Sequence, residues 1–430
     1  MTTVTHRVPG LVLRDHTFRV PVDHARPEGE QIDVFAREVV AAGRDAAQLP
    51  WLVFLQGGPG FASPRPTDNK GWLKRALQNY RVLLLDQRGT GRSTPLTAQT
   101  LARLTTPQAM ADYLKYFRAD AIVRDAEWIR RALLGESEPW SVLGQSFGGF
   151  CVTHYLSAAP AGLKEALITG GLPPLDRPVD DIYQATYQCV IERNRLYYER
   201  YPADVERAQT VVQYLSTHEV HLPTGDRLSP RRFQQLGMAF GASDGYEQIH
   251  YLLEEAFVLG SSGQELNYTL LRGLENKQAF DTNPLYAILH EALYCQQEAS
   301  RWSAERVRST YPEFALSPDR PVYFTGEMIY PWMFDEYERL RPLKEAAELL
   351  ASYEAWPRLY DPAVLRTNIV PCVAVIYYND MYVERRFSEE TAQNIQGMKV
   401  WVTNEHEHNG LRAEGEIILS RLLGLLHGEI

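Results

Sequence analysis

GQSFG, at residues 144–148, is the segment of this chain that is most informative about its fold. The residues before it, 140–143, predict a short buried strand, and Gly148 and Gly149 put small residues on the first turn of a predicted helix. A sharp turn from a strand into a helix holds a serine in a strained conformation with its hydroxyl exposed. We therefore predict that Ser146 is a nucleophile; the alternative is a glycine-rich structural turn with an idle serine.

A glycine-rich loop follows an earlier predicted strand, in the sequence LVFLQGGPG at residues 52–60. In enzymes with a serine on such a turn, an N–H of this loop and the N–H of the residue after the serine stabilise the oxyanion. We assign these two donors to Gly58 and Phe147. The alternative is an ordinary turn, since Pro-Gly marks turns in many proteins.

A third strand-and-loop pattern, YRVLLLDQRGTGRS, occupies residues 80–93. Asp86 in this pattern could be a catalytic acid, but we favour a structural carboxylate that ties the loop together. The order and spacing of GGPG, DQRGTGRS and GQSFGG resemble the prolyl aminopeptidase (proline iminopeptidase) family of serine peptidases, which are α/β-hydrolases. The C-terminal segment resembles the family too. One departure is Gln56, where many members have His; because the oxyanion donors are backbone groups, this change should affect only how the loop is held.

The resemblance implies an α/β-hydrolase fold, and the sequence pattern agrees with it. Predicted strands alternate with helices, which favours a mainly parallel sheet with helices on both faces. The alternation stops near Pro173, and helix-forming and aromatic residues dominate from there to about Pro357. We expect a hydrolase core at 1–177 and 361–430 with a helical cap inserted at 178–360. Helices are expected at 109–134, 183–201, 203–214, 246–259 and 412–426.

A serine nucleophile needs a base, and the base needs an orienting acid. The chain order in α/β-hydrolases is Ser, then Asp or Glu, then His. Asp380 directly follows a predicted strand at 373–378 and matches the family's position for the acid. The alternatives are that Asp380 is merely a turn residue and that Glu384 is the acid.

Two histidines compete for the role of the base in the loop after the last predicted strand. We favour His408 over His406, because His408 matches the family's pattern of His followed shortly by Gly and a helix. The His-x-His spacing, with Glu405 or Glu407 as an oxygen ligand, would also suit a metal. No remote third ligand cluster stands out, so we expect neither a metal nor a cofactor.

The family resemblance implies release of an N-terminal residue, preferentially proline, from a peptide through an acyl-enzyme. A pocket for a secondary ammonium needs carboxylates or carbonyls facing it. Glu291 and Glu327 lie among large apolar residues of the predicted cap. Phe147, Tyr294 and Trp332 could pack on the proline ring. The alternative is that the glutamates pair with arginines and the aromatic residues are simply core.

Composition narrows the class of protein further. The net charge of −10 disfavours nucleic acid and anionic membranes as partners and fits an amine-bearing substrate. The four cysteines are far apart, and the N-terminus has no apolar signal segment, so we expect a cytoplasmic enzyme. Its expected substrates are small peptides with a free N-terminal proline. A carboxylester hydrolase on the same scaffold and a catalytically silent binding protein are the alternatives.

Overall fold

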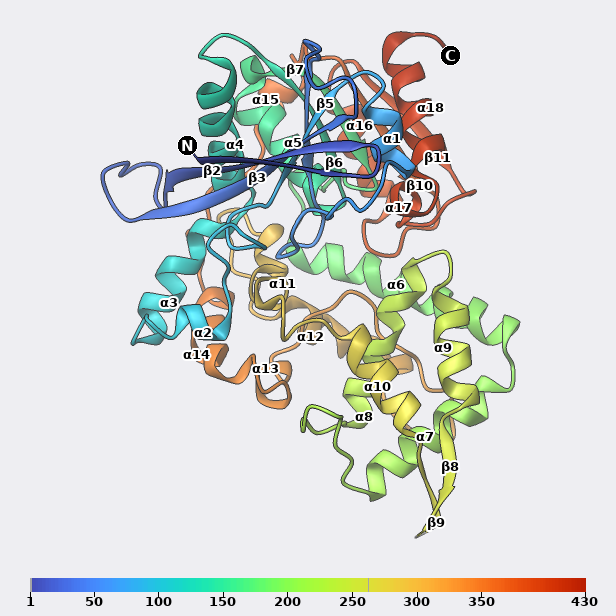
Figure 1. Cartoon of the computed structure of the whole chain (residues 1–430). Helices are drawn as coiled ribbons and strands as arrows, with labels where there is room; N and C mark the ends of the chain where they lie inside the picture. The colour runs from blue at the N-terminus through green and yellow to red at the C-terminus, as the bar shows by residue number, and fades with distance from the viewer. Residues whose placement is uncertain (1, 262) are drawn as a thin grey trace.

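The structure is a computed structural model that describes residues 2–261 and 263–430. Among these residues, nine strands form one sheet in the order β1-β2-β3-β5-β4-β6-β7-β10-β11, and two further strands form a small hairpin (Figure 1). The strands are β1 (Thr2–Val8), β2 (Leu11–Pro21), β3 (Gln31–Ala41), β4 (Trp51–Leu55), β5 (Arg81–Leu85), β6 (Trp140–Gln145), β7 (Leu163–Thr169), β8 (Phe257–Gly260), β9 (Gly263–Leu266), β10 (Cys372–Tyr377) and β11 (Met398–Thr403).

The sheet is antiparallel at one edge and parallel over the rest. Strands β1, β2 and β3 form an antiparallel meander, and β3 pairs antiparallel with β5. From β5 through β4, β6, β7 and β10 to β11 every pair is parallel. The predicted mainly parallel α/β sheet is confirmed, and the direction of these strands brings their carboxyl ends to one edge.

Different helices cover the two faces of the sheet, because successive side chains of a strand point to opposite sides. Val53 and Leu55 of β4 join the large apolar core that includes helices α4 and α5. Leu52 and Phe54 join the smaller core with α1 and α18 on the other face. The ring of Trp72 from α1 stacks on Phe54 with the ring centres 4.5 Å apart.

Helices connect and cover the strands. In the first part of the chain the helices are α1 (Gly71–Ala76), α2 (Ala98–Leu101), α3 (Pro107–Leu114), α4 (Ala119–Leu134) and α5 (Phe147–Ala158). Between β7 and β10 they are α6 (Val179–Arg200), α7 (Asp204–Thr217), α8 (Pro230–Gln234), α9 (Gly245–Glu254), α10 (Tyr268–Lys277), α11 (Pro284–Leu289), α12 (Ser303–Arg308), α13 (Met333–Glu336), α14 (Lys344–Ala351) and α15 (Pro362–Leu365). The last helices are α16 (Arg385–Gln393), α17 (Gly410–Ala413) and α18 (Gly415–His427).

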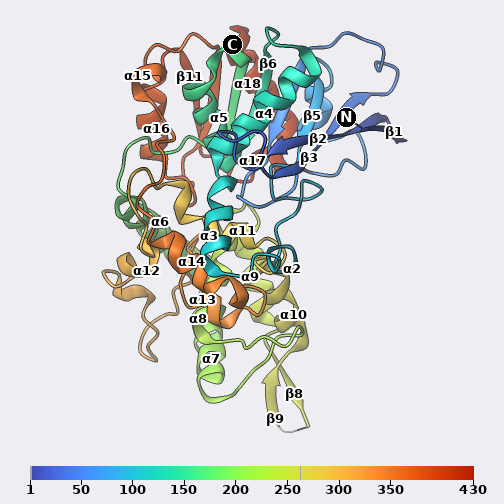
Figure 2. The same ribbon diagram turned by 90° about the vertical axis from the view of Figure 1, so that its left-hand side faces the viewer.

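The helices from α6 to α14 form a separate layer at one end of the sheet, which we call the cap (Figures 1 and 2). Helix α3 lies beside α14 in this layer. Buried Arg118 joins core and cap, because its guanidinium donates hydrogen bonds to the carbonyls of Ala292 (2.9 Å) and Cys295 (2.8 Å). The limits 178–360 for the inserted domain stay a prediction.

The structure differs from the predicted helices where tertiary contacts or glycines intervene. The helix expected over 109–134 is interrupted, and Arg118 is extended (φ −93°, ψ 179°) because its buried side chain binds cap carbonyls. The prediction of a helix over 246–259 was wrong beyond Glu254, where α9 ends. Phe257–Gly260 instead pairs antiparallel with Gly263–Leu266, and Gly263 has φ +116°, which favours glycine. This hairpin projects from the far end of the cap (Figure 2).

Candidate active site

Ser146 occupies a strained turn between β6 and α5. Its backbone has φ 53° and ψ −124°, a conformation that non-glycine residues rarely adopt. The turn requires close backbone contacts: a Cβ on Gly148 would lie 1.9 Å from the carbonyl oxygen of Leu55, and one on Gly144 would lie 2.3 Å from that of Gly148. The glycines of the GQSFG motif therefore permit the packing that holds the serine at the sheet edge.

Asp380 and His408 meet at the same edge, although 28 positions separate them in the chain. Asp380 lies just after β10, and its Oδ2 is 2.6 Å from His408 Nδ1. Its Oδ1 accepts hydrogen bonds from the N–H groups of Tyr382 (2.9 Å) and Val383 (3.0 Å). The backbone thus fixes one carboxylate oxygen and leaves the other to orient the imidazole.

The electrostatics of this pair favour a charged imidazole. Burial tends to lower the pKa of His408, but the charge and hydrogen bond of Asp380 outweigh it and hold that pKa above the ordinary 6.5. An imidazole with its Nδ1 on a buried carboxylate has its Nε2 available to accept a proton. The ring also packs edge-on against Tyr382, with the ring centres 4.7 Å apart.

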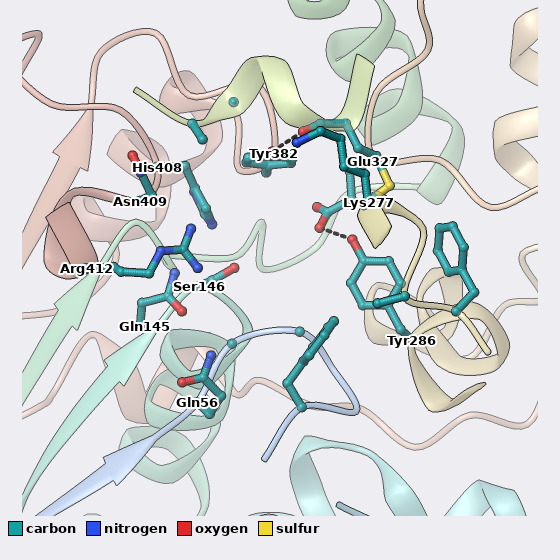
Figure 3. Close-up of a pocket in the computed structure, with 18 residues that line it drawn as sticks. Gln56, Gln145, Ser146, Lys277, Tyr286, Glu327, Tyr382, His408, Asn409 and Arg412 are labelled. Carbon is teal, nitrogen blue, oxygen red and sulfur yellow. Dashed lines mark hydrogen bonds between the residues drawn. The ribbon is translucent and has the colours of Figure 1, made fainter. Parts of the chain in front are cut away.

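Ser146 and His408 line one cavity of about 280 Å³ between the core and the cap (Figure 3). The GGPG loop forms its floor beside the serine, since a Cβ on Gly57 would lie 2.8 Å from the Cβ of Ser146. Gly58 lines the cavity, whereas the Phe147 ring is buried away from it and only its N–H, at the start of α5, can serve the site.

The GGPG loop, which follows Gln56, is held by a hydrogen bond from the DQRG loop. Gln87 Nε2 donates a 3.0 Å hydrogen bond to the backbone oxygen of Gln56, and the Gln56 side chain lines the cavity. This contact ties the GGPG loop to the DQRG loop. Asp86 contacts the segments that follow both loops. Its carboxylate accepts hydrogen bonds from the Ser63 N–H (3.0 Å) and the Arg92 N–H (2.9 Å), and it pairs with Arg65.

Glu327 is the cap carboxylate that lines the cavity. Its side chain accepts a hydrogen bond from the hydroxyl of Tyr286, which also lines the cavity (Figure 3). Its other neighbour, His290, has its Nε2 3.9 Å away. Burial lowers the pKa of His290 in spite of the charge on Glu327, which favours the neutral imidazole. Among the described residues, no lysine or arginine forms an ion pair with Glu327.

An irregular segment before α13 holds Glu327 in place. Asn194 of α6 binds both backbone groups of Phe324, with its amide and carbonyl each 2.8 Å from their partners. The N–H of Thr325 donates a 2.8 Å hydrogen bond to the carbonyl of Gln234 in α8. These bonds fix the backbone two and three residues before Glu327, so the carboxylate projects from a rigid support.

The other predicted cap residues lie outside the set that lines the cavity. Glu291 is buried, and its two oxygens accept hydrogen bonds from the Ser303 (3.1 Å) and Ala304 (2.9 Å) N–H groups at the start of α12. Burial raises its pKa to about 7. Trp332 stacks on a neighbouring tyrosine ring and lies under the guanidinium of an arginine; Tyr294 packs edge-on against Phe150 beneath the site.

The remaining candidates have structural environments of their own. Glu384 caps α16, with its side chain 3.2 Å from the Phe387 N–H, and the ring of His406 lies edge-on to Trp401. Within residues 2–261 and 263–430, no group of three or more His, Cys, Asp or Glu side chains could hold a metal ion. In the same residues no helix is both long and apolar enough to cross a bilayer.

A buried arginine that the sequence did not indicate supports the site. Arg193 of α6 pairs with Glu407, the residue before His408, and donates to the backbone oxygen of Asn379, the residue before Asp380. The sequence likewise did not indicate Lys277 and Arg412, which line the cavity. Their charged side chains in polar surroundings carry no local signal, since most lysines and arginines are solvent-exposed.

Comparisons with known proteins show the family of this chain. Residues 50–242 match the alpha/beta hydrolase fold family. A proline iminopeptidase of Aeromonas sobria is 49% identical over 427 residues, which cover 99% of each chain. Proline iminopeptidase aneH of Aspergillus aculeatus is 36% identical over 96% of this chain and 93% of its own. The crystal structure of a Mycobacterium smegmatis proline iminopeptidase is 14% identical, with a TM-score of 0.46 over 96% of this chain and 98% of its own. By its full-length identity to the Aeromonas protein, the chain belongs to the proline iminopeptidase family of α/β hydrolases.

Proposed function

We propose that this protein is a serine aminopeptidase that releases N-terminal proline from peptides. The observation that carries the proposal is Glu327, an anion in the same cavity as Ser146 and His408 with no lysine or arginine paired to it in the described residues. A carboxylate in such a place is costly unless a cation joins it. The ammonium of a peptide N-terminus is a cation of the right charge, and its binding beside the nucleophile selects the first peptide bond.

Proline suits the rest of the cavity. Phe61, Phe280 and Tyr286 line it near the cap and offer apolar surface for a pyrrolidine ring. The secondary ammonium of proline has two N–H donors, which fit the carboxylate of Glu327. The names of the Aeromonas and Aspergillus relatives favour the same substrate class.

In this proposal the reaction proceeds through an acyl-enzyme. Ser146 attacks the prolyl carbonyl as His408 Nε2 takes its proton, and Asp380 stabilises the imidazolium. The N–H groups of Gly58 and Phe147 bind the oxyanion. His408 then protonates the leaving amine, the peptide C–N bond breaks, and a water activated by His408 hydrolyses the prolyl ester of Ser146.

Reactivity toward five substrates tests the proposal. Chromogenic amides of Pro, Ala and Leu are compared with N-acetyl-Pro amide and a short-chain ester. We expect the free Pro amide to give the highest kcat/KM and the N-acetyl compound to react at least about 100-fold more slowly, because acetylation removes the charge that Glu327 binds. Equal rates for free and acetylated proline would overturn amine recognition. Faster turnover of the ester than of every amide would instead identify a carboxylester hydrolase.

The proposed compartment is the cytoplasm. All four cysteines are free thiols, and Cys151, Cys295 and Cys372 are buried. Thiols that stay reduced are typical of proteins in a reducing compartment.

A further inference from the structure

The cavity has charged groups of opposite sign on the two sides of the nucleophile. Figure 3 shows Glu327, Tyr286 and Lys277 on the cap side of Ser146, and His408 and Arg412 on the other side. All of them line the same cavity. The ammonium of Lys277 is bound to Gln248, which leaves Glu327 as the anion without a paired lysine or arginine on the cap side in the described residues. A substrate that spans the nucleophile therefore meets an anion at one end and a cation at the other.

Arg412 is the second arginine near the catalytic loops. It lies in α17, directly after the His408 loop, and its side chain is exposed at the cavity. In the described part of the chain it has no side-chain hydrogen bond or ion pair. Arg193, which also lies near the catalytic loops, is by contrast bound to Glu407 and to a backbone carbonyl. The five N–H donors of Arg412 are therefore free to bind a ligand.

The chemistry of the proposed function fixes which part of a substrate reaches Arg412. The proline must lie on the cap side, where Glu327 binds its ammonium. The nitrogen of the second residue must lie by His408, because that imidazole protonates it as it leaves. The substrate beyond the scissile bond consequently extends past His408, on the side from which Arg412 projects (Figure 3).

We propose that Arg412 binds the free C-terminal carboxylate of a short peptide, so that proline dipeptides and tripeptides are the preferred substrates. The inference rests on the proposed function. In a dipeptide the carboxylate carbon lies only about 2.5 Å beyond the leaving nitrogen, and each further residue adds about 3.5 Å. The long arginine side chain can adapt to either length, and its planar donors match a carboxylate with two parallel hydrogen bonds.

The effect of Arg412 on the base gives a second argument. The positive charge of Arg412 acts to lower the pKa of His408, against the effect of Asp380. A cation beside a general base opposes formation of the imidazolium that the reaction requires. A bound carboxylate would neutralise that cation during the chemical step, so the arrangement favours anionic substrates over neutral ones.

The test is the ratio of kcat/KM for Pro-Gly to kcat/KM for Pro-Gly amide, which differ only in the terminal charge. Wild type should prefer Pro-Gly by about tenfold, and Arg412→Gln should bring the ratio close to one, because one charge-assisted pair is lost. A ratio is the right measure, since any change that the substitution makes to the pKa of His408 in the free enzyme affects both substrates alike. The released proline is quantified directly, so no chromogenic group occupies the side of the leaving residue.

Two matched variants remove one positive charge elsewhere. Lys277→Gln alters the other cation of the cavity, which is bound to Gln248, and Arg421→Gln alters an exposed arginine that stacks on Trp401. Both should keep the wild-type ratio. A wild-type ratio near one, an Arg412→Gln ratio equal to that of wild type, or loss of the preference in Lys277→Gln would overturn the assignment. Failure to release proline from either peptide would instead overturn the proposed function.

Discussion

Arg193 of the cap forms a two-pronged ion pair with Glu407, the residue directly before the catalytic histidine candidate. Its Nη1 lies 3.1 Å from Glu407 Oε1, and its Nη2 contacts Oε2. The same Nη2 also donates to the backbone oxygen of Asn379, next to Asp380. A single guanidinium, only 8% exposed, thus connects the cap to both loops that carry the Asp380–His408 pair.

Removal of the Arg193 guanidinium should lower both the catalytic rate and the stability of the protein. We expect Arg193→Met to lower kcat for Pro amides by about 10- to 100-fold, since a small displacement of a base costs that much. The free energy of unfolding should fall by roughly 1–3 kcal/mol, less than for a fully buried pair because Glu407 is partly exposed. Steady-state kinetics and chemical denaturation measure the two effects.

A positioning role predicts more than a loss of stability. Arg193→Lys restores the charge without the planar fork and should recover only part of kcat, with KM little changed. A double-mutant cycle with Glu407→Gln measures the coupling of the pair. If kcat of Arg193→Met equals that of wild type at a temperature where both are folded, the bridge does not position the catalytic loops.

Ser146 and His408 should be indispensable, whereas His406 should not. We expect Ser146→Ala and His408→Ala each to lower kcat by roughly 10⁴- to 10⁶-fold with the fold intact. His406→Ala is the matched control, since that ring packs on Trp401 and its variant should keep most of its activity. Labelling with a fluorophosphonate should modify Ser146; modification of another serine would contradict the assignment.

The pH dependence should report the Asp380–His408 pair. Catalysis requires a neutral imidazole, and the pKa of His408 is raised above 6.5, so kcat/KM should rise with pH through a midpoint above 6.5. Asp380→Asn removes the charge that raises this pKa and leaves the effect of burial, so the residual activity should have its midpoint at a lower pH. A midpoint that stays in place would show that a different group limits the rate.

Glu327 and Glu291 form a matched pair of cap carboxylates. Glu327→Gln should lower kcat/KM for free Pro amides by about 30- to 1000-fold, as expected for loss of a charged partner of the ammonium. A short ester without an amine should be affected far less. Glu291→Gln should keep the selectivity for a free amine, because Glu291 binds the start of α12. If the two variants behave alike, the amine is bound elsewhere in the cap.

Glu291 should make stability depend on pH. Burial raises its folded pKa from 4.5 to about 7, so between these values the folded state holds a proton that the unfolded state has released. The stability that this proton contributes is present at low pH and is lost as pH rises toward 7. We expect the fall in Tm over this range to be smaller in Glu291→Gln than in wild type, as measured by thermal unfolding at each pH.

The features that depend on residues close together in the chain could be predicted from the sequence. The GQSFG turn, its buried strand and the glycine-rich loops were predictable because backbone strain and close packing require glycines at fixed positions. The alternation of strands and helices predicted the parallel sheet. Chain order predicted the acid, Asp380, directly after the strand at 373–378 and the histidine after the last strand. The hairpin β8–β9 and the break at Arg118 were not predicted, since the first depends on pairing and the second on cap carbonyls.

Residues with similar local surroundings in the sequence are distinguished by their contacts in the folded protein. His406 and His408 share one loop, but only His408 lies 2.6 Å from Asp380. Glu291 and Glu327 both lie among aromatic residues, yet one binds backbone N–H groups and the other lines the cavity. Arg193 is 214 positions from Glu407. Charge pairing acts through space over a few ångströms, so the pattern of residues along the chain cannot specify which of these groups meet.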